Sequence, residues 1–205
     1  ETAPADEIAN YEKKGYVFVS NSFDNQKYQA DDSNNVFEVH LKHGTKNVSR
    51  KDDVNMTVHY VMDDNSEAPS DNKQTVNFTE NGIQDLVTKD ITWTPADSQT
   101  FKDVVTPKLT GYTPDQDKAA GQTVNFGDTD INVTVHYNAD AQTATITYID
   151  DTDNKTLGSD NQNGKFNQVI TFEHDPAEVI KGLEEKGYVF VSNTFENQKY
   201  QADNK

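Results

Sequence analysis

The chain of 205 residues carries 35 acidic and 18 basic side chains, a net charge of −17, and a hydrophobic share of only 33%. This balance argues against nucleic acid and anionic membranes as partners, because phosphate binding requires clusters of Lys and Arg, and Arg50 is the one arginine. No apolar stretch approaches the ~20 residues that span a bilayer, so no membrane insertion is predicted, and the lack of cysteine excludes disulfides and thiol chemistry.

A segment near the start of the chain returns near its end. Residues 14–31 (KGYVFVSNSFDNQKYQAD) and 186–203 (KGYVFVSNTFENQKYQAD) differ at two positions only. The offset of 172 residues is too long for a solenoid, whose units span about 20 to 50 residues. Linked copies of a weak binding module gain avidity without new contacts. The sequence therefore indicates one period of an array of large modules, which suits repeated binding better than catalysis.

The first predicted element is a helix over residues 4–15. Its Pro4 and Gly15 match Pro176 and Gly187 of a later helix by the same offset. Proline is favoured in the first turn of a helix, and glycine just after the last turn. A strand is then predicted over 36–42 (VFEVHLK), in which apolar and polar residues alternate.

The middle of the chain is predicted to be mostly strand. Residues 55–62 (NMTVHYVM) and 132–138 (NVTVHYN) alternate, with Val and Tyr on one face. Shorter strands are predicted for two copies of QTVNF and for DITWTP, at 74–78, 122–126 and 90–95. At most one short helix, near 98–105, is expected.

The last third of the chain begins with a predicted hairpin. A β-branched strand over 143–149 (TATITYI) is followed by turn residues at 150–154 and by a second strand over 166–172 (FNQVITF). This arrangement requires a long connection between the two strands.

A second helix is predicted after that hairpin. Asp175 is expected to be its N-cap, Pro176 its first residue and Gly187 its end. A strand over 188–191 follows, and its apolar residues on both faces predict a central strand buried on both sides.

The two ends of the chain together supply one complete set of elements. Hairpin, helix and strand at the rear, followed by the last strand at the front, give the element order of a β-grasp, ubiquitin-like domain. We therefore expect an α+β, mostly β fold, built as tandem small β-grasp domains in an elongated array. The predicted domains are an incomplete module at 1–50, a central domain at 51–139 and an incomplete module at 140–205. Because unpaired edges invite pairing between molecules, domain-swapped self-association through the incomplete modules is also predicted.

Acidic clusters in the loops raise the question of a metal. Asp150, Asp151 and Asp153 are the best candidates for calcium, which accepts carboxylate and carbonyl oxygens in irregular geometry. Asp and Asn are also ordinary turn residues, and that alternative explains the cluster without a metal. No cofactor is otherwise required.

Four aromatic residues are candidates for sugar binding, because aromatic rings meet the apolar face of a sugar. They lie in polar, loop-like contexts: Trp93, Tyr112, Tyr28 and its copy Tyr200. The alternative for Trp93 is that it anchors the core of the central domain. No catalytic residue is predicted, because no nucleophile elbow, zinc motif or phosphate-binding loop is present.

Several of these motifs resemble a known family. TITYIDDTDN (145–154), QVITF (168–172) and KGYVFVSN (186–193) are similar to the mucin-binding repeats of Gram-positive surface adhesins. The central domain resembles the second domain of those mucus-binding repeats, on the motifs TVHYVMDD, DITWTP, LTGYTP and VTVHYN at 57–64, 90–95, 109–114 and 133–138. The resemblance implies an extracellular, cell-wall-anchored protein that adheres to mucus glycoproteins.

The functional hypothesis is therefore a non-catalytic adhesin repeat that binds mucin-type host glycoproteins weakly and multivalently. One alternative is a structural stalk without a ligand. Another is the capture of a different host glycoprotein such as immunoglobulin through an exposed sheet edge. An enzyme is the least expected class.

Overall fold

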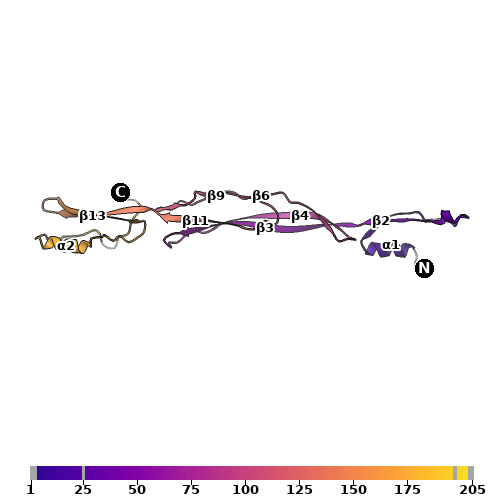
Figure 1. Ribbon diagram of the computed structural model, residues 1–205, viewed down its shortest axis with the longest axis horizontal. Coiled ribbons are helices and arrows are strands. Elements are labelled where there is room, and N and C mark those ends of the chain that lie inside the picture. The colour runs from indigo at the N-terminus through magenta and orange to yellow at the C-terminus, as the bar shows by residue number, and fades with distance from the viewer. Residues whose placement is uncertain (1–3, 25, 196–197, 203–205) are drawn as a thin grey trace. The chain divides into compact units, whose positions relative to one another are not determined.

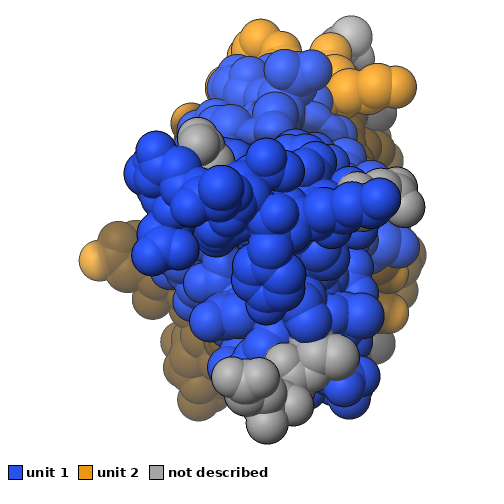
Figure 2. All heavy atoms as spheres, turned by 90° about the vertical axis from the view of Figure 1, so that its right-hand side faces the viewer, with its two compact units in different colours: residues 1–55, 75–101, 122–130 blue, residues 56–74, 102–121, 131–205 orange. Residues whose placement is uncertain are grey.

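The computed structural model describes residues 4–24, 26–195 and 198–202. They form two compact units, which Figure 2 distinguishes by colour: residues 1–55, 75–101 and 122–130, and residues 56–74, 102–121 and 131–205. The long strands β3 and β4 contribute residues to both units. The three predicted domains divide the chain differently and stay a prediction.

The fold is α+β and mostly β, as predicted (Figure 1). The helices are α1 (Pro4–Lys13), the 3₁₀ helix η1 (Asp32–Asn35) and α2 (Pro176–Glu184). The strands are β1 (Tyr16–Asn21), β2 (Val39–His43), β3 (Thr45–Met62), β4 (Asn72–Asp85), β5 (Ile91–Thr94), β6 (Gln99–Thr100), β7 (Val104–Val105), β8 (Tyr112–Pro114), β9 (Lys118–Ala119), β10 (Thr123–Val124), β11 (Ile131–Ala139), β12 (Ala141–Asp150) and β13 (Lys155–Lys165).

The front of the chain forms helix α1 and the antiparallel pair β1 and β2, in which Tyr16 lies opposite His43. Gly15 ends the helix segment at a φ of 101°, a conformation that L side chains rarely adopt. The predicted helix is confirmed, and β2 occupies most of the predicted strand 36–42. Val17 and Val19 of β1 are 42% and 53% exposed, because β1 pairs with a single strand in the described chain.

Backbone hydrogen bonds form a close-packed junction between this front module and the next strand, within the same unit. The Gly44 nitrogen donates to the Gly15 carbonyl at 2.8 Å, and the Leu86 nitrogen donates to the Gly44 carbonyl at 2.8 Å. A Cβ on Gly15 would overlap the backbone of Leu86. Beside this contact, His43 Nδ1 lies 2.6 Å from Asp85 Oδ2. Since β3 begins at Thr45, the junction positions the first residues of β3.

The junction should respond to acid. The hydrogen bond from His43, with backbone bonds from Thr88 and Val87, lowers the pKa of the Asp85 carboxyl below its usual range. A carboxyl with a lowered folded-state pKa stabilises the fold above its unfolded pKa and loses that contribution as pH falls through the folded value. We therefore expect the melting temperature of the parent chain to fall more steeply below about pH 4 than that of Asp85→Asn.

Thermal melts followed by circular dichroism between pH 6 and pH 2.5 measure this difference. Asp97→Asn is the matched control, because the Asp97 carboxylate makes no hydrogen bond or ion pair within the described residues. Equal slopes for the parent chain and Asp85→Asn would contradict the prediction.

The central sheet has the strand order β5-β4-β3-β11-β8. Strands β3 and β11 run parallel, with Met56 opposite Ile131 and Tyr60 opposite Val135. The pairings of β4 with β5 and of β11 with β8 are antiparallel, which makes a mixed sheet of the β-grasp kind. The predicted alternation is confirmed: from Val54 to the end of β3 every second residue is buried, namely Val54, Met56, Val58, Tyr60 and Met62.

The short helix expected near 98–105 was wrong. These residues form β6 and β7, which pair with β10 and β9. Phe101 and Val104, three residues apart, are both buried, so their spacing resembles one face of a helix. The backbone is instead held by other strands: the Phe101 nitrogen donates to the Gln122 carbonyl, and the Thr106 nitrogen donates to the Asp117 carbonyl.

The rear hairpin differs from the predicted one. β12 covers the predicted strand 143–149, but its partner is β13 and not residues 166–172. The predicted long connection is a short turn, in which Asn154 adopts a φ of 53° and the Thr152 nitrogen donates to Asp150 Oδ1. The β13 sequence is polar, so hydrophobic periodicity could not reveal it.

Helix α2 is confirmed in detail. Asp175 accepts from the Ala177 nitrogen as N-cap, Pro176 is the first residue, and Gly187 follows the helix at a φ of 95°. The strand predicted over 188–191 was wrong: Val189 and Val191 are 83% and 72% exposed. The same sequence forms β1 at the front because β2 pairs with it there, and the described rear copy has no such neighbour.

Candidate functional site

Arg50 lies at the centre of a cluster of aromatic side chains in the unit that contains residues 1–55. Its guanidinium carbon is 4.5 Å from the centre of the Trp93 ring and 4.6 Å from that of Phe126. Arg50 Nε and Nη2 both donate to Glu80 Oε2, at 2.8 and 2.5 Å. Phe78 packs edge-on against Phe126. We call these five residues the arginine-aromatic cluster.

The cluster follows from alternation along neighbouring strands. Successive side chains of a strand point to opposite faces, so Phe78 and Glu80 of β4 share one face. Both are buried, and Glu80 is a charged side chain that requires the paired Arg50. Trp93 of β5 lies opposite Gly82 of β4, where a Cβ would be 2.7 Å from the indole ring. Glycine at position 82 therefore allows the indole to lie close to the strand.

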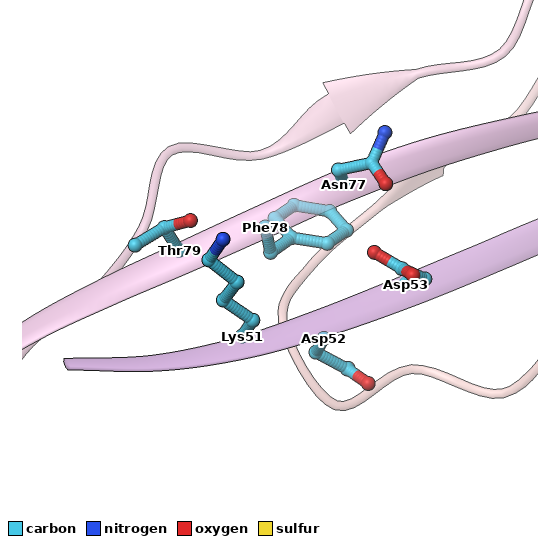
Figure 3. A pocket seen from close by; sticks show the side chains of 6 residues that line it. All are labelled: Lys51, Asp52, Asp53, Asn77, Phe78 and Thr79. Carbon is cyan, nitrogen blue, oxygen red and sulfur yellow. The ribbon is translucent and has the colours of Figure 1, made fainter.

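A shallow open hollow of about 580 Å³ lies beside the cluster (Figure 3). Lys51, Asp52 and Asp53 of β3 line one side, and Asn77, Phe78 and Thr79 of β4 line the other. Phe78 is only 2% exposed and belongs to both the hollow and the cluster. Asp53 is directed toward the space between the strands, whereas Asp52 points away from β4 and accepts from the Gly127 nitrogen at 2.7 Å.

The hollow offers polar groups around an apolar residue. In the described part of the chain, the side chains of Lys51, Asp53, Asn77 and Thr79 make no hydrogen bond or ion pair with other residues. Ammonium, carboxylate, amide and hydroxyl groups can together donate to and accept from several hydroxyl groups. Such a surface suits a polyhydroxylated ligand that binds weakly.

Trp93 is half-buried, and its ring contacts Arg50 and Gly82. The structure thus gives the predicted ligand residue a structural part in the cluster, while a fraction of its surface stays accessible. Its cation-π contact with a half-exposed arginine is worth roughly 0.5 to 2 kcal/mol.

Tyr112 belongs to the other unit. Its hydroxyl is 2.8 Å from Asp64 Oδ2 and 3.0 Å from Ser66 Oγ, and its ring packs edge-on against Phe166. Burial is the main cause that raises the pKa of Tyr112. Although burial opposes the change, hydrogen bonds from Ser66 and Tyr112 lower the pKa of Asp64. The ring and hydroxyl of Tyr112 are thus occupied by neighbours within this unit.

The third candidate, Tyr28, and its repeat copy Tyr200 differ in exposure. Tyr28 is 96% exposed, whereas Tyr200 is 4% exposed. The Tyr200 ring packs on Gly164 of β13, and its hydroxyl donates to the Gln162 carbonyl at 3.1 Å. A ring in this position is not accessible to a glycan, so only Tyr28 of the pair remains open.

The calcium candidates lie at the turn between β12 and β13. Asp150 ends β12 and accepts from the Thr152 nitrogen, as expected of a turn residue, while Asp151 and Asp153 are exposed. Among the residues that the structure describes, no group of three or more Asp, Glu or His side chains is arranged to hold a metal. Calcium binding at this turn stays a prediction.

Reasoning from sequence missed most of the residues of this site. Of the cluster and the hollow, it proposed Trp93 alone. The one available signal was the single arginine, Arg50, in a chain of 35 acidic residues. The sequence contains no motif that groups Lys51, Asn77 and Thr79, because the pairing of β3 with β4 brings them together.

In a comparison with known protein families, two family models together match every residue of the chain except Gly44. The family described as "Muc B2-like domain" matches residues 45–141, and the family described as "Mucin binding domain" matches residues 1–43 and 142–205. A search of curated proteins found no match. No helix within the described residues is long and apolar enough to cross a membrane.

Several solved structures are similar to this chain, and the first described here agrees with this assignment. The crystal structure of Mub-RV is 31% identical, with a TM-score of 0.59 over 68% of this chain and 83% of that one. A type 2 repeat of the mucus binding protein MUB from Lactobacillus reuteri is 28% identical over 68% and 83%, with a TM-score of 0.48. A MucBP domain from Lactobacillus acidophilus is 31% identical over 47% and 99%, with a TM-score of 0.42.

Proposed function

The chain belongs to the mucin-binding domain family of mucus-binding repeats, and from this we propose that it is a non-catalytic repeat of a cell-wall-anchored bacterial surface adhesin that binds mucin-type host glycoproteins. The observation that carries the proposal is the pair of family matches, which account for residues 1–43 and 45–205. Weak binding by each repeat is amplified when several repeats are linked.

We place the contact with the glycan at the hollow between β3 and β4. Its open shape and its exposed polar side chains suit the hydroxyl groups of a sugar. Asp52 and Asp53 leave it negatively charged despite Lys51, and the whole chain carries −17. Acidic sugars are repelled by such a surface, so the proposed ligand is a neutral part of the mucin glycan.

The lack of catalysis is supported by the geometry of the acids. Glycoside hydrolysis requires two carboxyl groups that face each other across the bond to be cleaved. Asp52 and Asp53 are consecutive residues of one strand and point in different directions (Figure 3). The hollow therefore suits binding rather than cleavage.

Binding to immobilised purified mucin, before and after periodate oxidation of its sugars, tests the proposal. We expect saturable binding that oxidation abolishes and that removal of sialic acid leaves unchanged or strengthens. Asn77→Ala should weaken binding at least severalfold, because it removes an amide from the hollow, whereas Asn81→Ala on the same strand should not.

Trp93→Phe separates the two roles of the indole. Loss of stability would assign Trp93 to the core, and weaker mucin binding at unchanged stability would assign it to the ligand site.

No binding above that of an unrelated acidic protein would overturn the proposal in favour of a stalk. Binding that survives oxidation, or that immunoglobulin shares, would indicate recognition of protein instead of glycan. Self-association of the chain would add to the avidity of either contact.

A further inference from the structure

The central part of the chain begins and ends with two strands that pair directly with each other. Strand β3 is the first element of the Muc B2-like match, and β11 is the last strand that ends within it. The two pair in parallel over seven residues, from Met56 opposite Ile131 to Met62 opposite Tyr137. The chain therefore enters this pairing through β3 at the Met56 end, the entry end, and leaves it through β11 at the Tyr137 end, the exit end.

Tension along the chain acts on this pairing as shear. A pull on the preceding chain draws β3 outward at the entry end, and a pull on the following chain draws β11 outward at the exit end. Because the strands are parallel, the two pulls act in opposite directions along the strand axis and load all the hydrogen bonds of the ladder together. Two antiparallel strands in the same place would have both outer ends on one side, and their bonds would break one after another.

Tension reaches the two strands through connections of one residue each. Gly44 alone separates β2 from β3, and Asp140 alone separates β11 from β12. The Gly44 nitrogen donates to the Gly15 carbonyl at 2.8 Å. The Asp140 nitrogen donates to the Gly111 carbonyl at 2.9 Å. Each connection is therefore short and hydrogen-bonded, and it leaves no slack before the pairing is loaded.

Further hydrogen bonds extend the pairing at both ends. At the entry end, the backbone nitrogen and Nδ2 of Asn55 donate to Asp130 Oδ1, at 2.8 and 3.2 Å. At the exit end, the Asp63 nitrogen donates to the Tyr137 carbonyl at 3.0 Å, and the Ala139 nitrogen donates to Asp63 Oδ1 at 3.1 Å. These contacts lie where tension enters and leaves the pairing, so they bear it together with the ladder.

Sliding of the two strands would also disrupt buried packing. Val58 and Tyr60 of β3 and Val135 and Tyr137 of β11 are all buried. The ring centres of Tyr60 and Tyr137 are 6.2 Å apart, and the Tyr137 hydroxyl donates to the Pro107 carbonyl at 2.6 Å. Relative motion of the strands therefore costs side-chain contacts in addition to backbone hydrogen bonds.

We propose that residues 55–63 and 130–139 form a tension clamp, which resists unfolding when force is transmitted along the chain. Seven residue pairs that must separate together present a higher barrier than pairs that separate in turn, and forced unfolding is governed by the rate of crossing that barrier. The clamp does not depend on what the chain binds. Its use in a surface protein that holds a cell against flow rests on the proposed function.

Single-molecule force spectroscopy with two directions of pull tests the clamp. The chain has no cysteine, so pairs of introduced cysteines at exposed positions define the attachment points. Lys46→Cys with Ala141→Cys pulls β3 at the entry end and β11 at the exit end, which shears the pairing. Glu67→Cys with Ala141→Cys pulls at the exit end alone, which peels it. We expect the shearing geometry to require at least about twofold more force. Equal forces would overturn the proposal.

Removing Asp130 distinguishes the clamp from a general effect on stability. In the shearing geometry, Asp130→Ala should raise the rate of unfolding under load about fivefold, the effect of one net hydrogen bond. Asp115→Ala is the matched control, because Asp115 Oδ1 accepts from the His136 nitrogen at 3.0 Å on the side of β11 that pairs with β8. Urea unfolding should show similar losses for the two variants.

An unchanged rate under load for Asp130→Ala would contradict the clamp, and so would equal increases for Asp130→Ala and Asp115→Ala. Both results are independent of mucin binding, so a failure of the clamp and a failure of the proposed function are told apart. The comparison of the two pulling directions leaves the clamp residues unsubstituted, so it decides the question even if a variant does not fold.

Discussion

Gly15→Ala should lower the free energy of unfolding of the unit that contains residues 1–55 by about 2 to 5 kcal/mol. Gly15 has a φ of 101°, at which a Cβ is strained, and the added atom would overlap the Leu86 backbone. Left-handed strain accounts for about 1 to 2 kcal/mol, and overpacking adds about 1 to 3 kcal/mol. Urea unfolding followed by the fluorescence of Trp93, which lies in the same unit, measures the loss.

The repeat supplies a matched control for this substitution. Gly187 occupies the same position in the rear copy at a φ of 95°, but a Cβ there would meet nothing within 4 Å. Gly187→Ala should therefore show the left-handed strain alone. If the two substitutions destabilise equally, the contact between Gly15 and Leu86 makes no contribution, and the junction is not held by close approach of the backbones.

Arg50→Met should destabilise the same unit by about 2 kcal/mol, and it should do so through Glu80. The Glu80 side chain is 8% exposed and loses both hydrogen bonds from the guanidinium, which leaves a buried charge without its partner. Fully buried pairs lose about 3 to 5 kcal/mol in this way. The smaller value is expected because the Arg50 side chain is 47% exposed.

Two further variants isolate the cause. Lys51→Met removes a neighbouring cation that makes no ion pair in the described structure, and it should change stability by less than about 0.5 kcal/mol. Arg50→Met combined with Glu80→Gln should recover part of the loss, because the buried carboxylate is then neutral. Additive effects in this double-mutant cycle would argue against coupling between the two residues.

Several elements were predictable because their signals are local. The alternation that buries Val58 and Tyr60 depends only on the period of a strand, and the N-cap at Asp175 depends only on the chemistry of one side chain. The glycines at 15 and 187 end their helix segments for a reason that no distant residue changes. The family resemblance rests on the same short motifs.

Other features depend on which strands become neighbours. Strand β13 is polar, but it pairs with β12 through backbone bonds and through contacts such as Thr145 Oγ1 to Asn161 Oδ1 at 2.6 Å. Residues 166–172 look like a strand, yet within the described residues they form an isolated bridge, between Val169 and Lys199. The hydrophobic pattern predicts a strand for residues 166–172 and none for β13, because it does not measure backbone pairing.

The sequence by itself determined the mostly β class, both helices with their ends and the family, since each rests on residues within one short window. Only the tertiary structure decided that Arg50 meets Trp93, Phe126 and Glu80, and that Tyr200 is buried while Tyr28 is exposed. Burial and ion pairing are properties of residues far apart in the chain. Identical windows such as QKYQAD therefore reach different states, because β13 and residues 166–170 pack against the rear copy.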